Sequence, residues 1–208
     1  MQDLISFARR KLKFLPGYSI LRRLYLVGTV PEHWARIVMN RETEKLIATL
    51  PINGMRALEI SGEEWGRKMH FKAYESVHYP QFDVCESALD ETFDLIIAEQ
   101  VFEHLLWPYR AGKNIYKMLQ PGGYFLLTTP FLIRIHNFPT DCTRWTETGI
   151  KYLLAECGFD LERVRTGSWG NRACIRANFF RWALFRPLLH SLRNEPDFPI
   201  VVWAIAQK

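Results

Sequence analysis

Residues 93–105 read FDLIIAEQVFEHL, and residues 119–131 read LQPGGYFLLTTPF. In the first stretch an uninterrupted apolar centre ends at Glu99, which is typical of a strand covered on both faces of a sheet. The second stretch opens with a PGG turn at 121–123 and continues as another apolar strand. The residues between them, 108–120, have the spacing of a helix. This order favours two parallel strands joined by a crossover helix.

The same alternation continues on both sides of this unit. Further strands are expected at 56–61, 71–77, 161–169 and 200–208, and further helices at 31–50 and 146–159. We expect Pro31 to open the first helix, and Thr146 and Gly158 to cap the two ends of the second. The pattern indicates an α/β fold with a largely parallel sheet, in which ligands bind beyond the carboxyl ends of the strands. The candidate site therefore lies within 59–66, 75–79, 99–104 and 130–145.

Read in order, these segments resemble class I S-adenosylmethionine-dependent methyltransferases, and most closely their type 11 group. The quoted strand–helix–strand unit carries most of the resemblance. The later stretch HNFPTDCTRWTETGIKYLLAECGF, 136–159, is similar to a segment found in many of these enzymes. The resemblance implies a Rossmann-like, seven-stranded, mostly parallel sheet with helices on both faces and an antiparallel last strand. It also implies S-adenosyl-L-methionine as the methyl donor.

The expected donor loop is RALEISGEEWGRK, 56–68. The family pattern E-x-G-x-G-x-G keeps its acid here, but its three glycine positions hold other residues, and we expect Gly62 and Gly66 to make the turn instead. A methyl donor carries no phosphate, so it needs no row of backbone amides. Its sulfonium and ammonium groups suit acidic side chains. Glu59 at the methionine end of the donor, with Ser61 and Gly62 in the loop, is what the resemblance implies, while a capping role for Glu59 stays open.

The resemblance assigns the rest of the donor site to residues after the next strands. Glu75 would end the second strand and hold the ribose hydroxyls, since a carboxylate can accept two hydrogen bonds from a diol. Asp83 would meet the adenine amino group, with Val84 beside the ring, although an ordinary turn aspartate is the alternative. Glu99 and Gln100 would line the donor pocket.

The candidate catalytic residues are His104, His136, Asp141 and Arg144, in the segments after the fourth and fifth family strands. A hydroxyl acceptor must lose its proton during methylation, and a histidine that titrates near neutrality suits that work. A carboxylate acceptor would need no base, and Arg144 could then hold its charge. Two alternatives remain open, namely a structural His104 and an ion pair between Arg144 and Asp141. No metal is expected, because no cluster of acids and asparagine stands at a strand end.

The net charge of +5 belongs to one end of the chain. Residues 1–23 hold six basic side chains against one acid, six minus one, so the remaining residues sum to zero. We expect a basic amphipathic arm over 1–30 and a methyltransferase domain over 31–208. The arm either packs on its own domain or contacts an anionic membrane or a phosphorylated substrate. No nucleic acid is expected as a partner, because the body lacks a basic stripe with interleaved aromatics.

Two functions follow as expectations. The first is O-methylation of a small biosynthetic acceptor, such as a sugar, a lipid-linked intermediate or a secondary metabolite. The second is a binding or scaffold protein that kept the fold and lost the chemistry. A nicotinamide dehydrogenase is disfavoured because G-x-G-x-x-G does not follow the first strand. The four cysteines form no metal-binding spacing, and no apolar run reaches the roughly 18 residues of a membrane span, so we expect a cytoplasmic protein, membrane-peripheral at most.

Overall fold

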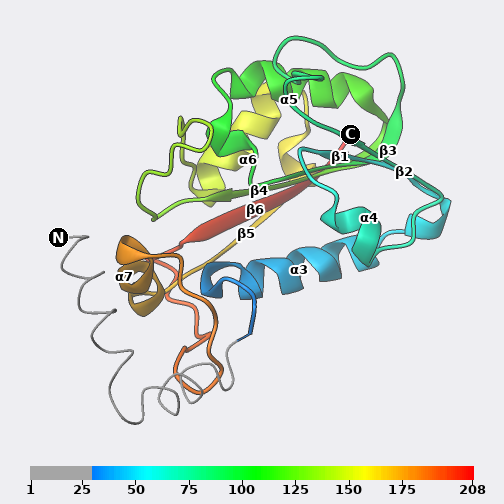
Figure 1. Cartoon of the computed structure of the whole chain (residues 1–208). Coiled ribbons are helices and arrows are strands. Elements are labelled where there is room, and N and C mark those ends of the chain that lie inside the picture. Colours follow the sequence, from blue (N-terminus) through cyan, green and yellow to red (C-terminus); the bar gives the residue numbers. More distant parts are fainter. Residues whose placement is uncertain (1–29) are drawn as a thin grey trace, which may run out of the picture.

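The computed structural model describes residues 30–208, and within them six strands form one sheet (Figure 1). The strand order is β2-β1-β3-β4-β6-β5. The strands are β1 (Arg56–Ile60), β2 (Ala73–Val77), β3 (Phe93–Glu99), β4 (Leu119–Pro130), β5 (Val164–Trp169) and β6 (Val201–Gln207). The first four run parallel, while β6 is antiparallel to both β4 and β5. The expected α/β class and the antiparallel last strand are therefore confirmed.

Helices cover both faces of this sheet (Figure 1). One face carries α3 (Ile37–Ala48) and α4 (Glu64–Lys68), and the other carries α5 (Pro108–Met118) and α6 (Glu147–Glu156). Within residues 30–208 the remaining helices are α7 (Arg172–Phe180) and four 3-10 turns at Trp34–Arg36, Ile52–Gly54, Phe102–His104 and Leu161–Arg163.

The apolar centre of β3 fills both cores, as its sequence predicts. Leu95 and Ile97 lie in the cluster beneath α3 and α4, whereas Ile96 and Ala98 lie in the cluster beneath α5 and α6. All four are fully buried. Alternate side chains of one strand thus hold the two helical layers onto the sheet, and Glu99 is delivered to the carboxyl edge between them.

Two expectations about the elements are wrong. The predicted seventh strand is absent from the described residues, because the connection 78–92 from β2 to β3 folds into turns and adds no strand outside β2. Pro31 does not open a helix. The backbone bends at Pro31 and Glu32 and pairs with a later segment, since Trp34 donates to the Ala183 carbonyl at 2.8 Å and Phe185 donates to the Glu32 carbonyl at 2.8 Å.

Candidate active site

Two sharp turns mark the carboxyl edge of the sheet. Ser61 follows β1 with φ 60°, and Gln100 follows β3 with φ 56°, both in the left-handed region that side chains other than glycine rarely adopt. Gln100 is held there by Thr128 at the end of β4, because its backbone N–H donates to the Thr128 carbonyl at 3.0 Å. Strain of this kind, on two adjacent strands at one edge, is typical of a ligand site in an open α/β sheet.

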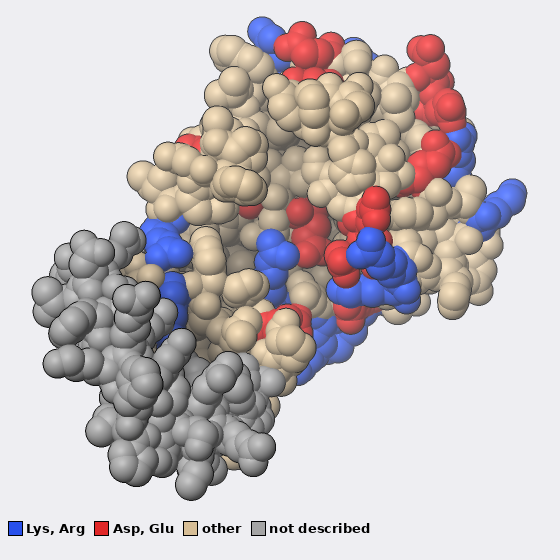
Figure 2. Space-filling view, in the orientation of Figure 1, with Lys and Arg blue, Asp and Glu red and all other residues tan. Residues whose placement is uncertain are grey.

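Charged side chains gather beside this edge. In the orientation of Figure 1, Figure 2 shows acidic and basic groups over the middle of the visible face, where the surface is hollowed. A separate hollow of about 250 Å³ lies at the opposite, amino edge of the sheet, and it contains none of the predicted site residues.

Glu59, at the end of β1, is buried and holds the loop that follows. Its carboxylate accepts hydrogen bonds from the Trp65 N–H at 2.9 Å, the Glu64 N–H at 3.3 Å and the Tyr74 hydroxyl at 2.6 Å. Burial and this last hydrogen bond raise the pKa of Tyr74. The capping role left open by the sequence is therefore present, and contact between Glu59 and the methyl donor stays a prediction.

The glycines of the loop do not make its turn, contrary to expectation. Neither Gly62 nor Gly66 has a positive φ, and Ser61 carries the left-handed conformation instead. The glycines are required for close approach. A Cβ on Gly62 would overlap the Glu59 carboxylate, and one on Gly66 would overlap the Tyr74 ring. The altered loop is thus built around the buried Glu59.

Glu99 is tied to both sides of the edge. The Trp65 indole donates to Glu99 Oε2 at 3.0 Å, and the Arg36 guanidinium lies 3.5 Å from Oε1. Burial raises the pKa of Glu99, although Arg36 opposes the shift. Sequence reasoning missed Arg36, because nothing in its local pattern shows that it reaches a strand end more than sixty residues away.

The expected position of Glu75 is wrong. Strand β2 continues to Val77, so Glu75 lies in its middle, opposite Leu58 of β1. Its carboxylate pairs with Arg56, at 2.9 Å from Nε, at the amino end of β1. The strand expected over 71–77 does end at Val77, so the error lies in the assignment of Glu75 to the strand end, two residues too early.

Asp83 and Val84 lie in the turns between β2 and β3. Asp83 accepts a hydrogen bond from the Cys85 N–H at 2.8 Å, as a turn aspartate does. Val84 is buried, and its carbonyl accepts from the Asn114 side chain of α5 at 2.9 Å. The turn-aspartate alternative is present in the structure, and adenine contact by this pair stays a prediction.

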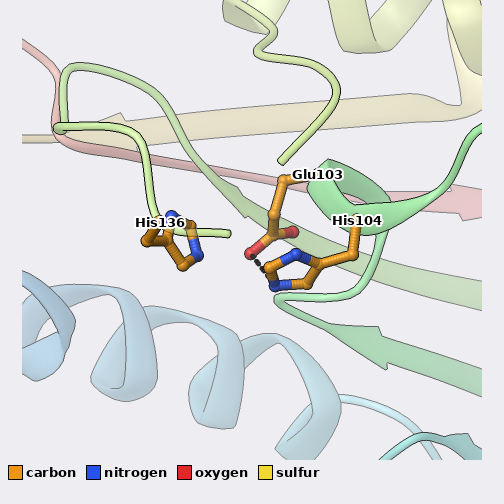
Figure 3. A group of neighbouring side chains, drawn as sticks. All are labelled: Glu103, His104 and His136. Carbon is orange, nitrogen blue, oxygen red and sulfur yellow. Dashed lines mark ion pairs between the residues drawn. The ribbon is translucent and has the colours of Figure 1, made fainter. Parts of the chain in front are cut away.

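The structure brings the two candidate histidines together. Their rings lie 5.0 Å apart, with His104 in the 3-10 turn after β3 and His136 in the loop after β4 (Figure 3). The Thr140 carbonyl contacts His104 Nδ1, and the Thr140 hydroxyl donates to the His104 carbonyl at 2.8 Å. Burial lowers the pKa of His136. The two loops are therefore bound to each other, and both rings are held at the edge where the strands end.

Asp141 and Arg144 form a hydrogen-bonded pair that contacts the backbone of His136. Asp141 Oδ2 accepts from the His136 backbone N–H at 2.8 Å and from Arg144 Nη2 at 2.5 Å. Burial alone would raise the pKa of Asp141, but hydrogen bonds from Arg144 and from His136 outweigh it and lower the pKa. The ion-pair alternative for Arg144 is thus present, and a role in holding an anionic acceptor stays a prediction.

Glu103, which the sequence analysis did not choose as a site residue, lies between the histidines and the core. Its side chain is 1% exposed, and Oε1 is 3.7 Å from His104 Nε2 (Figure 3). Burial raises the pKa of this carboxyl to about 7. The sequence did contain a signal for Glu103, because this acidic residue directly precedes the predicted site residue His104.

Comparison with known proteins shows what this arrangement is similar to. A family model described as a methyltransferase domain, of type 11, matches residues 54–127. No curated protein matches the sequence. Many solved structures share its fold, which confirms the class I S-adenosylmethionine-dependent methyltransferase fold predicted by the resemblance, and the type 11 likeness rests on the family model.

Three of these structures show the extent of the likeness. An S-adenosylmethionine-dependent methyltransferase from Mesorhizobium loti is 16% identical, with a TM-score of 0.55 over 80% of this chain and 97% of that one. One from Archaeoglobus fulgidus is 14% identical, with a TM-score of 0.52 over 83% and 94%. Phosphoethanolamine N-methyltransferase 2 from Haemonchus contortus, in complex with S-adenosyl-L-methionine, is 12% identical, with a TM-score of 0.55 over 81% and 52%. At these identities the likeness establishes the fold alone, and the identity of the methyl acceptor has to be inferred from the residues of the site.

Proposed function

We propose that the protein is an S-adenosylmethionine-dependent methyltransferase that methylates a hydroxyl of a small biosynthetic acceptor, such as a sugar, a lipid-linked intermediate or a secondary metabolite. The observation that carries the proposal is the pair of histidine rings, His104 and His136, 5.0 Å apart beside the carboxyl edge of β3 and β4. The acceptor would lie between segments 103–107 and 131–145, which follow those two strands.

The residues at the edge suit the proposed donor. S-Adenosylmethionine supplies a methyl group on a positively charged sulfur that leaves readily. The edge of β1 and β3 ends in two carboxylates, Glu59 and Glu99, and offers no glycine-rich cradle for a phosphate. A donor that carries positive groups and no phosphate matches this chemistry better than a dinucleotide does. The chain's remaining contribution is to align the acceptor and to exclude water.

The histidine pair is placed to take the proton of a hydroxyl acceptor. Because a carbonyl oxygen only accepts, the Thr140 contact requires His104 Nδ1 to carry the hydrogen. Neutral His104 then bears its lone pair on Nε2, on the side of Glu103. Asp141 and Arg144 orient His136 and its loop. A base so placed accepts the proton as the oxygen attacks the methyl carbon.

Donor binding is tested by calorimetry with S-adenosylhomocysteine at millimolar concentration. We expect a clear isotherm, and in Glu59→Ala a loss of at least about 1 kcal/mol, since the loop would lose a charge-assisted anchor. A flat trace from folded protein would contradict the proposal. It would favour the catalytically degenerate scaffold, the alternative that the altered loop keeps open.

Base catalysis is tested once an acceptor has been found by incubating labelled donor with host extracts. We expect His104→Ala or His136→Ala to lower turnover roughly 10²–10⁴-fold at unchanged donor affinity. His70→Ala, at an exposed histidine outside the site, is the matched control. Full turnover in both site variants would exclude a histidine base and point to a carboxylate acceptor.

A peripheral membrane contact through residues 1–23 is the second part of the proposal, with the protein on the cytoplasmic side. These residues lie outside the described part of the chain, and their net charge of +5 is the support. Within the described part, no helix has the length and apolar character to cross a bilayer. Several large apolar side chains there are nevertheless exposed between positions 179 and 189, namely Phe179, Phe180, Leu188 and Leu189.

Liposome sedimentation tests this contact. Replacement of Arg9, Arg10, Lys11 and Lys13 by glutamine should release the protein from vesicles that contain anionic lipid, because each basic residue near such a surface contributes about 1 kcal/mol. Donor binding should not change. Equal sedimentation of both forms would remove the membrane contact from the proposal.

A further inference from the structure

Glu103, His104 and His136 form a group of three potential metal ligands. They come from two different loops, and Figure 3 shows all three side chains directed toward one shared space. One donor atom from each lies within 4.8 Å of the others, and the Glu103 Oε1 to His104 Nε2 separation is 3.7 Å. A metal bound at about 2.0–2.2 Å from each donor needs separations of roughly 3.4 Å. A small movement of the His136 loop is therefore enough to close the group.

The carboxylate of this group has an unsatisfied atom. Glu103 is 1% exposed, and its Oε2 has no hydrogen-bond partner among the described residues. A buried carboxylate oxygen without a partner is destabilising, and such groups in native proteins are normally paired, protonated or bound to a metal.

His104 is oriented as a metal ligand is, and His136 has a carboxylate beside its ring. Metal-bound histidines usually donate their second ring nitrogen to a carbonyl or carboxylate, which fixes the ring and its tautomer. The Thr140 carbonyl takes this part for His104 and leaves Nε2 free toward Glu103. Asp141 Oδ2 lies 3.3 Å from His136 Nδ1 without a hydrogen bond to it, accepts from the His136 backbone N–H instead, and is held in place by the Arg144 guanidinium.

We propose that Glu103, His104 and His136 bind one divalent transition-metal cation, of the kind represented by Zn²⁺, Co²⁺ and Mn²⁺. Two imidazoles and one carboxylate suit these metals, whereas Mg²⁺ and Ca²⁺ prefer ligand sets made of oxygen. Three protein ligands leave at least one coordination position open. The sequence analysis expected no metal, because it searched for acids and asparagine at one strand end and not for ligands from two loops.

The open coordination position of the metal gives the site a chemical role. This role rests on the proposed function, the methylation of a hydroxyl acceptor. A hydroxyl bound to such a cation loses its proton much more easily than a free hydroxyl does. The cation would then replace the histidine base, because a ring nitrogen bound to the metal has no lone pair for a proton; the hydroxyl proton would pass to solvent water, and the histidines would act through the cation. Metal binding itself requires neither donor nor acceptor, so the two proposals can fail separately.

Titration of the full-length, chelator-treated protein with Co²⁺ alone tests the inference. We expect one Co²⁺ per chain with visible absorption bands, displaced by Zn²⁺. Glu103→Gln and His136→Ala should each weaken binding at least tenfold, while His70→Ala, at an exposed histidine, should bind like the unaltered chain. Circular dichroism checks that each variant is folded. Should Glu103→Gln fail to fold, His136→Ala carries the test, since His136 lies in a loop.

Two results would overturn the inference. One is the lack of saturable Co²⁺ binding by the unaltered protein, which would mean that Glu103 is simply protonated in its buried site. The other is equal affinity in His136→Ala and the unaltered chain, which would place the metal on other ligands. Calorimetry with S-adenosylhomocysteine on the same preparations reports separately on donor binding, so a failed metal site is not confused with a failed methyltransferase.

Discussion

At the scale of single residues, the loop after β1 is built around one buried carboxylate. Glu59 accepts hydrogen bonds from two loop amides and from Tyr74, and Gly62 lies directly against it. The family's glycines serve a turn beside the donor, whereas the glycine here serves an internal contact. The sequence shows which residues differ from the family pattern, but the reason for Gly62 needs the position of the Glu59 side chain.

Replacing Gly62 by alanine should therefore destabilise the fold. The new Cβ would overlap the Glu59 carboxylate, which cannot withdraw without losing its amide hydrogen bonds, so we expect a loss of about 1–3 kcal/mol. Urea unfolding measures it. Gly54→Ala is the matched control, because a Cβ there meets nothing within 4 Å, and its stability should not fall. Equal stability of the two variants would mean that Glu59 is not fixed as described.

The cysteines should differ sharply in reactivity. All four are free thiols, and only Cys142 is exposed. Burial raises the pKa of Cys157 to about 11 and that of Cys174 to about 12, and it also raises the pKa of Cys85. Since the thiolate is the reactive form, a thiol reagent at pH 8 should label one cysteine in the native protein and four in denaturant. Rapid labelling of more than one native thiol would contradict the described packing.

At the scale of elements, the sequence predicted correctly those features that depend on neighbouring residues in the chain. The apolar run of β3 and the caps of α6 are correct, since Thr146 accepts from the Gly149 N–H and Gly158 has φ 115°. Elements fixed by distant partners were not predictable. The residues around Pro31 are not helical because they pair with residues 183–185. Arg36 and Thr140 also contact residues that are distant in the sequence. The sequence therefore indicated His104 and His136 as candidate site residues, but it did not indicate the contacts that fix their loops.

The cap at Thr146 gives a prediction at this scale. Its hydroxyl accepts from the Gly149 N–H at 3.1 Å, so Thr146→Ala leaves that donor unpaired and should cost about 0.5–2 kcal/mol in urea unfolding. Thr148→Ala, at an exposed site within the same helix, controls for the loss of a threonine. If Thr148→Ala destabilises the protein as much, the hydrogen bond is not responsible.

At the scale of the whole molecule, residues 30–208 keep the strand order of the methyltransferase fold with one strand fewer than expected. The apolar pattern predicted both helical layers, and the antiparallel β6 follows from the resemblance. The strand count could not be predicted, because a connection as short as 78–92 can add an edge strand or fold into turns. The loss lies at the β2 edge, while β1, β3 and β4, which carry the candidate site, are complete.

Binding at this complete edge should stabilise the entire fold, because a ligand that binds only the native state shifts the unfolding equilibrium. S-Adenosylhomocysteine at 100 times its Kd should add about 2.7 kcal/mol. For a domain of this size each kcal/mol raises the unfolding midpoint by about 2–4 °C, so the expected rise is about 5–11 °C. A nicotinamide dinucleotide is the control. Its pyrophosphate would meet Glu59 and Glu99 and no glycine-rich loop, so it should leave the midpoint unchanged. Equal shifts of the unfolding midpoint by both ligands would show that the edge does not select by charge. No shift with S-adenosylhomocysteine would contradict the proposal that the protein binds S-adenosylmethionine.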